Sequence, residues 1–332
     1  MEKRLEKTND SSAVVSGLGD HVEVIMPSGE RNFPLLIVSG NDIDCISWGE
    51  MYKDQINELL LIHGALLLRG FEIGSAQKFN DLFSIIAGKA LEYKNRTAPR
   101  DQVFNHVYTS TSHPSDQVIH MHTENSYAKT SARIIAFYCL IPSAGGGETP
   151  IADERELVQS LSEETIRKFR ERNIQYVRNI FPGVGLDLKT IYQTDNKEEL
   201  HKIFEESGID HEWISANHLR IKWVFPAFQV HPVTRNEEWF NHMYFGHKSL
   251  YDAQVLDIFD EEDLPFITYY GDGSKIEDSV IQECKDFYEQ KSIVFKWEKD
   301  DFLLLDNMRY SHGRKPYEGD RTILTAMAQP VY

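Results

Sequence analysis

The sequence predicts an α+β protein with a mainly β core and helices inserted between its strands. Apolar runs at 133–141 (RIIAFYCLI) and 301–307 (DFLLLDN) have the pattern of buried strands, and segments of helical spacing lie between them. Candidate metal ligands occur in two segments far apart in the chain, and a rolled β scaffold can bring such segments together. No Pro- or Gly-rich linker, repeat or low-complexity tract divides the sequence.

In chain order, residues 48–62 carry apolar side chains at helical spacing and predict an amphipathic helix, followed by a short buried strand at 65–70. Further helices are expected at 77–88, 153–172, 196–208 and 275–291. Strands are expected at 133–141 and 174–180, a hairpin or strand pair at 216–232, and two strands within 292–307. Residues 306–314 predict a turn, and a closing strand begins at Arg321.

We expect a single domain over 21–332, preceded by a polar and loosely ordered stretch at 1–20. That stretch lacks the apolar core of a signal peptide, and no apolar run reaches membrane-spanning length. The three cysteines, Cys45, Cys139 and Cys284, are odd in number and widely spaced. This argues against a disulfide framework and for a reducing, cytoplasmic location.

The formal net charge of −17 argues against nucleic-acid and anionic-membrane partners, because both would be repelled. We interpret the charge as a solvated acidic surface. An acidic carrier protein would also be repelled unless a local basic patch offsets the charge, and the sequence does not show whether one exists. The oligomeric state stays open.

The most informative motif is His122-Thr123-Glu124, taken together with the distant His312. Two imidazoles and one carboxylate are the protein ligands of a non-haem Fe(II) site, which leaves adjacent positions for a co-substrate and O₂. On an extended segment alternate side chains share a face, so His122 and Glu124 can reach one metal while Thr123 points away.

The motif alone is weakly specific. With 13 His and 52 acidic residues in 332, a His-x-acid pattern should occur about twice by chance. It does occur twice, because His21-Val22-Glu23 has the same form. We interpret His21 as a surface residue in a polar stretch without an ordered neighbourhood.

Several blocks in the same order resemble the TauD/TfdA family of Fe(II)/2-oxoglutarate-dependent dioxygenases. They are HGALLLRGF, YKNRTAPR, VYTSTSHP, HTENSY, GGGETPIADER, VRNIFPGVG, FPAFQVHPVTRNEEWFNH and LLLDNMRYSHGR. The chain looks most similar to SyrP-like and clavaminate-synthase-like members, which carry Glu where most relatives carry Asp. This resemblance implies a double-stranded β-helix (jelly roll) with helical insertions.

The resemblance also implies roles for individual residues. His122, Glu124 and His312 match the iron ligands, and Thr149 matches a hydroxyl that contacts a 2-oxoglutarate carboxylate. Arg321 matches the arginine that grips the far carboxylate, and a guanidinium fork suits a planar carboxylate. Taurine dioxygenase has a second arginine just beyond for the substrate sulfonate, whereas this chain has Thr325 at or near that place. A sulfonate substrate is therefore not expected.

The implied reaction couples oxidation of a substrate by O₂ to conversion of 2-oxoglutarate into succinate and CO₂. Halogenases of this fold have a small residue at the carboxylate position, so Glu124 favours hydroxylation, or desaturation or cyclisation. By resemblance we expect hydroxylation of an aliphatic C–H bond on a small amino acid or amino-acid-derived metabolite, in natural-product biosynthesis. Related members act on amino acids tethered to an acyl or peptidyl carrier protein, which is an open alternative. A non-catalytic metal- or metabolite-binding protein is the alternative of another class.

Other polar residues have two interpretations each. Gln117, Asn125 and Tyr127 flank the motif and are substrate-facing candidates or supports of the ligands. His120 could join His122 and Glu124 in a cupin-type site, or pack within a strand. The remaining candidates are His231 and His242, as pocket or hairpin residues, and Arg309 and Arg314, as active-site residues or surface ion pairs. Glycines 145–147 predict a tight turn, since no phosphate-binding context accompanies them.

Overall fold

The computed structural model describes residues 17–27, 34–40, 43–92, 101–110 and 113–332. Its largest sheet has eight strands in the order β1-β2-β3-β16-β7-β19-β5-β4. These strands are β1 (Val22–Ile25), β2 (Leu35–Ser39), β3 (Ala65–Arg69), β4 (Gln102–Phe104), β5 (Val107–Thr109), β7 (Ser131–Ile141), β16 (Phe302–Asp306) and β19 (Thr322–Val331). The mainly β core expected from the apolar runs is thereby confirmed.

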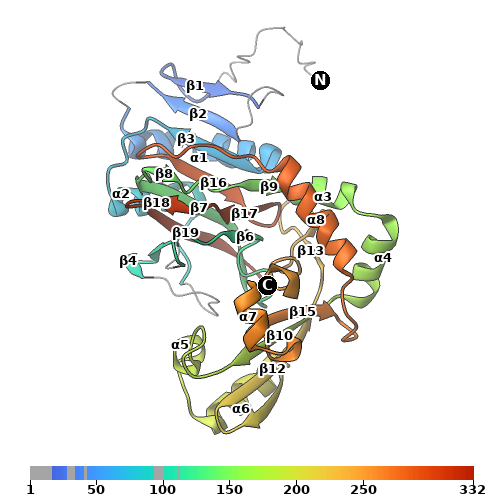
Figure 1. Ribbon diagram of the computed structural model, residues 1–332. Helices are drawn as coiled ribbons and strands as arrows, with labels where there is room; N and C mark the ends of the chain where they lie inside the picture. The colour runs from blue at the N-terminus through green and yellow to red at the C-terminus, as the bar shows by residue number, and fades with distance from the viewer. Residues whose placement is uncertain (1–16, 28–33, 41–42, 93–100, 111–112) are drawn as a thin grey trace.

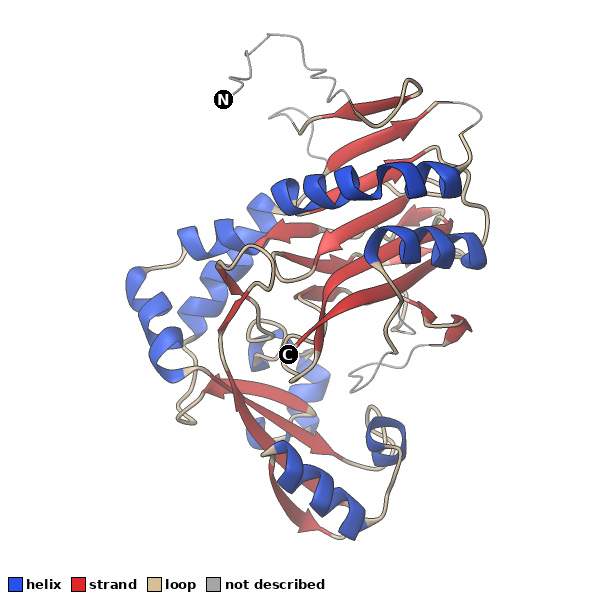
Figure 2. Ribbon diagram, turned by 180° about the vertical axis from the view of Figure 1, so that it is seen from behind, coloured by secondary structure: helices blue, strands red, loops and turns tan. Residues whose placement is uncertain are grey.

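Two helices, α1 (Cys45–His63) and α2 (Ala76–Ala87), cover one face of this sheet (Figure 2). The side chain of Asp44 caps α1 by accepting from the backbone N–H of Ser47. Phe79 of α2 packs against Tyr138 and Phe302 of the sheet, with ring centroids 5.2 and 5.3 Å apart. Both helices confirm the predictions made from helical spacing.

A smaller sheet lies against the opposite face of the large sheet. Its order is β6-β17-β9, from β6 (Ile119–His122), β17 (Tyr310–Arg314) and β9 (Ile151–Asp153). Ile151 of β9 belongs to the same apolar cluster as Leu67, Phe137 and Leu305 of the large sheet. The pair β8 (Gly145–Gly146) and β18 (Tyr317–Glu318) is formed by the segments that flank this sheet. Both imidazoles of the motif therefore sit on the smaller sheet.

Part of the segment between the two motif regions forms a separate lobe, drawn at the bottom of Figure 1. Its sheet has the order β11-β12-β10-β15, from β10 (Ile174–Ile180), β11 (Asp210–Ser215), β12 (His218–Phe225) and β15 (Phe266–Tyr270). Helices α5 (Leu188–Tyr192) and α6 (Lys197–Ser207) pack on it through an apolar cluster that includes Leu200 and Phe204. The other elements are α3 (Glu154–Ser160), α4 (Glu163–Arg172), α7 (Ala253–Ile258), α8 (Asp278–Lys291), η1 (Lys248–Leu250), η2 (Glu261–Asp263), β13 (Phe228–Val230) and β14 (Glu237–Trp239). None of the described helices is both long and apolar enough to cross a membrane.

Two predicted elements are divided in the structure. The helix expected at 153–172 breaks at Leu161, which is extended, because the hydroxyl of Ser162 accepts from the N–H of Thr165 and starts α4. The segment 216–232, expected as a hairpin or strand pair, does form two strands, but they do not pair with each other because they join different sheets. β12 pairs with β10 and β11, whereas β13 pairs with β14.

Four further expectations need correction. Only β16 forms within 292–307, where Ile293 contributes a single bridge to Ile151. Of the turn predicted at 306–314 only residues 307–309 form a turn, and His312 lies on β17. Of the stretch expected to be loose, 1–16 lie outside the described residues, but Leu18 is buried and its carbonyl accepts from the indole of Trp48 at 2.9 Å. His21 is exposed as expected, but it directly precedes β1, so its neighbourhood is ordered.

Candidate metal centre

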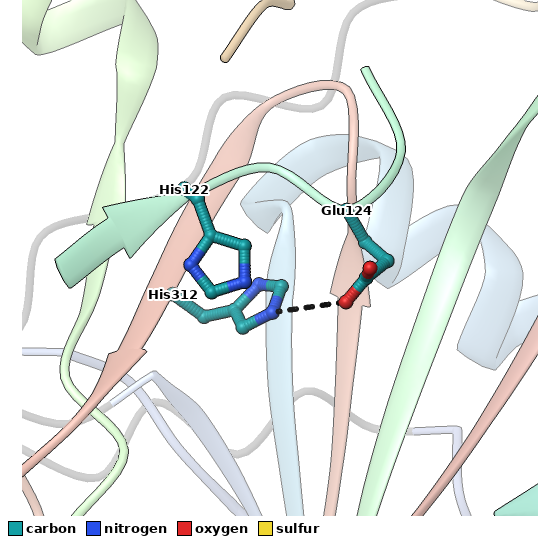
Figure 3. Close-up of side chains that lie close together, drawn as sticks. All are labelled: His122, Glu124 and His312. Atoms are coloured by element: carbon teal, nitrogen blue, oxygen red, sulfur yellow. Dashed lines mark ion pairs between the residues drawn. The ribbon is translucent and has the colours of Figure 1, made fainter. Parts of the chain in front are cut away.

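His122, Glu124 and His312 converge on one point (Figure 3). His122 and His312 are direct partners in the antiparallel register of β6 and β17, and their ring centroids are 4.5 Å apart. Glu124 lies in the turn after β6, and its Oε2 is 3.9 Å from Nε2 of His312. One ligand atom from each residue lies within 4.8 Å of the others. The two segments thus meet as the motif predicts, although Glu124 is not part of the strand.

Backbone packing explains how the two histidines come so close. A Cβ added to Gly313 would lie 2.7 Å from the carbonyl oxygen of Ile119 and 3.2 Å from the sulfur of Met121. Any larger residue would therefore push β17 away from β6 beside His312. Glycine at this position permits the close approach of the two strands.

Asn307, which is fully buried, fixes the turn that carries Glu124. Its side-chain oxygen accepts from the N–H of Glu124 at 2.8 Å, and its amide nitrogen donates to the carbonyl oxygens of Glu124 and Ala132 at 3.0 and 2.8 Å. Two of these three hydrogen bonds hold the backbone of Glu124 against the turn that precedes β17, and the third ties the same amide to Ala132. The carboxylate is thereby positioned relative to His312.

The donor set fits a divalent metal. Nδ1 of His122 lies 2.8 Å from the carbonyl oxygen of His120, which only accepts, so Nδ1 carries the proton and Nε2 keeps its lone pair. Glu124 and His312 are 3% and 4% exposed. A buried carboxylate is costly without a cation, and two imidazole nitrogens with one carboxylate suit Fe(II).

A cavity of about 610 Å³ opens beside the three ligands. The residues expected to contact 2-oxoglutarate, Thr149 and Arg321, line the same cavity, as does the exposed Gln117. Apolar residues form much of the remaining wall, namely Val118, Ile119, Phe137, Phe245, Leu250, Val255 and Ile323. Metal ligands, polar anchors and an apolar wall therefore share one enclosure.

Arg321 is a cation that faces this cavity without a carboxylate partner among the described residues. Its Nε donates to the carbonyl oxygen of Gly147 at 2.9 Å, which leaves the rest of the fork available. Burial, and next the charge of Arg314, lower the pKa of Arg321 to about 10. Gly147 has a φ of +74°, and a Cβ there would lie 2.9 Å from Cδ of Arg321, so glycine is required beside it. Gly145 and Gly146 form β8 in place of the tight turn predicted at 145–147, and the carbonyl of Gly147 supports this arginine.

Thr149 and Thr325 have different environments. The hydroxyl of Thr149 accepts from the indole N–H of Trp297 at 3.1 Å, so its own proton is available to an acceptor in the cavity. Thr325 is buried within β19 and donates to the carbonyl oxygen of Ala136 at 3.0 Å. Thr325 therefore has a structural bond in the large sheet.

The two arginines that flank His312 also have different environments. Arg314 lines the cavity, and its two terminal nitrogens donate to the backbone carbonyls of His113, Pro114 and Gln117. Arg309 instead pairs with Asp153 at 2.7 Å and does not line the cavity. Arg314 therefore holds the segment at the cavity mouth, whereas Arg309 ties β17 to the start of α3.

The neighbouring histidines also separate into supporting and cavity residues. His231 is buried and its Nε2 lies 2.9 Å from a carboxylate oxygen of Asp306. It does not line the cavity, so it is a supporting residue. His120 lines the cavity but does not belong to the described metal-ligand group, so the cupin-type arrangement is not formed. His242 lines the cavity with its ring 5.5 Å from that of His122. Burial, and next the charge of His122, lower the pKa of His242 to about 3.

Asn125 and Tyr127 are buried and do not line the main cavity. The hydroxyl of Tyr127 donates to the side-chain oxygen of Asn125 at 3.1 Å, and the Tyr127 ring packs edge-on against His242 at 5.0 Å. Asn125 has a φ of +55°, which asparagine tolerates in a turn. This placement favours the supporting interpretation for both, whereas Gln117 remains a substrate-facing candidate.

Comparison with known sequences decides the family. The profile described as "Taurine catabolism dioxygenase TauD, TfdA family" matches residues 33–327. The chain belongs to this family. It is therefore a dioxygenase of the class that uses Fe(II) and 2-oxoglutarate, as the resemblance of the sequence blocks predicts.

Individual relatives agree with this membership. The dapdiamide synthesis protein DdaC of Enterobacter agglomerans is 37% identical over 310 residues, which cover 92% of this chain and 93% of that protein. A clavaminate synthase-like protein of Arabidopsis thaliana is 26% identical, covering 83% and 85% of the two chains. The structure of PvcB from Pseudomonas aeruginosa aligns with a TM-score of 0.53 at 15% identity, over 94% and 93% of the chains. At that identity the structural likeness shows the fold alone.

Asn307 was not identified from the sequence. The only signal was its position directly after a predicted strand and five residues before His312. We predict that Asn307→Ala weakens Fe(II) binding by about 10- to 100-fold, because an outer support of a metal ligand is lost. Anaerobic calorimetric titration with Fe(II) measures this effect.

The matched control is Asn57→Ala, since the Asn57 amide also donates to two backbone carbonyls but does so between α1 and α2. It should leave the iron affinity unchanged. Equal affinities of the wild-type protein and Asn307→Ala would contradict the role of Asn307.

Proposed function

We propose that the protein, a single domain over 21–332, hydroxylates an aliphatic carbon of a small amino acid or amino-acid-derived molecule. The observation that carries the proposal is the convergence of His122, Glu124 and His312 on a cavity that also presents Arg321. The stacked large and small sheets support the further proposal that the core is a double-stranded β-helix.

In this proposal each cavity residue has one task. His122, Glu124 and His312 hold iron(II), while Arg321 and the hydroxyl of Thr149 bind the carboxylates of 2-oxoglutarate. When bound, iron(II) with O₂ and 2-oxoglutarate supplies an oxidant for an aliphatic C–H bond, and 2-oxoglutarate leaves as succinate and CO₂. Phe137, Phe245 and Ile323 exclude water from the reacting atoms. The remaining space accommodates a small substrate.

Hydroxylation is favoured over halogenation because Glu124 occupies the position that a halide would need. Desaturation or cyclisation would use the same residues. Only analysis of the product distinguishes these reactions from hydroxylation. The names of two relatives support a place in natural-product biosynthesis. DdaC is a dapdiamide synthesis protein, and PvcB is described as an Fe, alpha-ketoglutarate dependent oxygenase from an isonitrile synthetic pathway.

Charge at the cavity mouth supports a free substrate over one tethered to a carrier protein. Among the described residues that line the cavity, the exposed charged ones are Asp116 and Asp252. The cationic residues of the lining are Arg314, which is buried and bonded to backbone carbonyls, and Arg321. An acidic carrier would meet like charge at this mouth, in addition to the overall −17.

The metal assignment predicts that His122→Ala or His312→Ala abolishes Fe(II) binding and 2-oxoglutarate turnover, because the site has only three protein ligands. Metal content and succinate formation measure the two effects. The exposed His21 precedes Glu23 in the same pattern, so His21→Ala is the matched control and should change neither. Iron binding that is lost in His21→Ala and kept in His122→Ala would overturn the ligand set.

The co-substrate assignment predicts that Arg321→Lys weakens 2-oxoglutarate binding by about 1.5–3 kcal/mol, roughly 10- to 100-fold, because lysine keeps the charge and loses the fork. Thr149→Ala should cost about 1 kcal/mol for one hydroxyl bond. The apparent Michaelis constant for 2-oxoglutarate measures both. An unchanged constant in Arg321→Lys would mean that another cation holds the carboxylate.

The reaction itself is tested with a panel of amino acids, each offered free and loaded on a carrier protein, with products analysed by mass spectrometry. We expect a gain of one oxygen atom on a free substrate. Oxygenation of carrier-loaded substrate alone would refute the free-substrate proposal. A chlorinated product, or loss of two hydrogens without oxygen, would refute hydroxylation.

A further inference from the structure

Arg178 is a buried cation without an anionic partner. It lies on β10 and is 8% exposed, and its Nη2 is buried without a hydrogen-bond partner. Within the described part of the chain, its side chain makes no hydrogen bond or ion pair and contacts the rings of Tyr127 and Phe266, at 5.9 and 5.7 Å from Cζ to the centroids. Buried arginines are normally paired, because an isolated buried charge is destabilising. An anionic ligand would supply the missing partner.

His242 presents the complementary unpaired group. Its Nδ1 lies 3.1 Å from the carbonyl oxygen of Thr123, which only accepts, so Nδ1 carries the proton and Nε2 is an acceptor. Nε2 is buried and has no hydrogen-bond partner in the described structure. A buried acceptor without a donor is costly, so a ligand N–H or O–H would stabilise it.

Both groups lie around Tyr127, next to the wall of the main cavity. The Tyr127 ring centroid is 5.0 Å from that of His242 and 5.9 Å from Cζ of Arg178. The charge of Arg178 also acts electrostatically on His242 and on Tyr251, and both of these line the cavity. The Arg178 guanidinium and the His242 acceptor therefore both lie close to Tyr127, and of the two only His242 lines the cavity.

The other two arginines near the cavity are already engaged. Arg314 donates to three backbone carbonyls, and Arg321 is assigned to 2-oxoglutarate. Thr325, which the sequence resemblance places at or near the substrate arginine of taurine dioxygenase, has its hydroxyl bonded within the sheet. Arg178 does not itself line the cavity, but it contacts Tyr127, whose ring packs against the lining residue His242, and its Nη2 has no acceptor among the described residues.

We propose that Arg178 and His242 form the subsite for the polar head of the substrate. Arg178 binds a carboxylate, and His242 accepts a hydrogen bond from an N–H or O–H group beside that carboxylate. The inference rests on the proposed function and narrows its substrate class to molecules in which a carboxylate neighbours an amine, amide or hydroxyl, as in an α-amino acid. Residues from the lobe (Arg178) and from the segment after β14 (His242) thereby select the substrate that the metal centre oxidises.

Three probes separate the two contacts. L-Norvaline carries both groups, L-norvalinamide lacks the carboxylate and pentanoate lacks the amine. Their affinities are measured by calorimetry on protein loaded with Fe(II) and 2-oxoglutarate in the absence of oxygen. In the wild-type protein, norvaline should bind about 10-fold or more tightly than either partial probe, because a charge-assisted bond is lost in each comparison.

The variants should lose these preferences one at a time. Arg178→Met should bind norvaline and norvalinamide alike while still preferring norvaline to pentanoate. His242→Phe should show the opposite pattern. Arg170→Met is the matched control, because Arg170 also packs over an aromatic ring, that of Phe228 at 4.2 Å, but pairs with the exposed Glu237 outside the cavity. It should retain both preferences.

Thermal unfolding separates recognition from a purely structural role. Arg178→Met removes an unpaired buried charge, so its melting temperature without ligand should equal or exceed that of the wild type. A lower melting temperature with unchanged probe preferences would assign Arg178 to packing and overturn the proposal. Failure of the wild-type protein to bind either carboxylate probe would also overturn it. Succinate formation by the wild-type protein tests the proposed function separately.

Discussion

The pairing of β6 with β17 is the constraint on which the site depends. His122 and His312 are 190 positions apart in the chain, yet they face each other because their strands are in register. A shift of that register by one residue would turn one imidazole to the opposite face and separate the ligands. Gly313 removes the side chain that would hold the strands apart, and Phe137 of the large sheet packs against His312 at 4.9 Å. Metal binding is thus built on strand pairing and sheet packing.

Glu124 depends on the same pairing through a different interaction. It lies in a turn, where the backbone alone would not fix its direction, and the buried amide of Asn307 holds it. Asn307 itself follows β16, so the central sheet positions the carboxylate while the smaller sheet positions the imidazoles. The three ligands therefore reach one point only when both sheets are assembled. A site of this kind is absent from the unfolded chain, so metal binding should favour the folded state.

The sequence predicted the elements whose signals are local. Helical spacing located α1 and α2, and apolar runs located β7 and β16, because one buried face is enough to define each of them. Prediction failed where the pairing partner of a segment, and not its own sequence, decides its structure. Residues 216–232 resemble a hairpin, but each strand finds a partner elsewhere, and residues 292–297 are apolar without becoming a strand. For the site, spacing and resemblance brought the ligands and Arg321 together, whereas Asn307 carries no signal that distinguishes it from other asparagines at strand ends.

The arginines near the cavity show why charge cannot be interpreted from sequence alone. Arg309 and Arg314 lie three residues before and two residues after His312, yet one pairs with Asp153 and the other with backbone carbonyls. Arg321 keeps most of its fork free because its neighbour is a glycine carbonyl, and Arg178 contacts aromatic rings in place of acids. Four identical side chains thus differ in available binding capacity according to the partners that the fold places beside them. The chain has 52 acidic residues, enough to supply a carboxylate partner for each of these four arginines. Arg321, which lines the cavity, and Arg178, which lies behind Tyr127, have neither a carboxylate nor a full set of backbone acceptors, and we attribute this to anions that arrive with the co-substrate and the substrate.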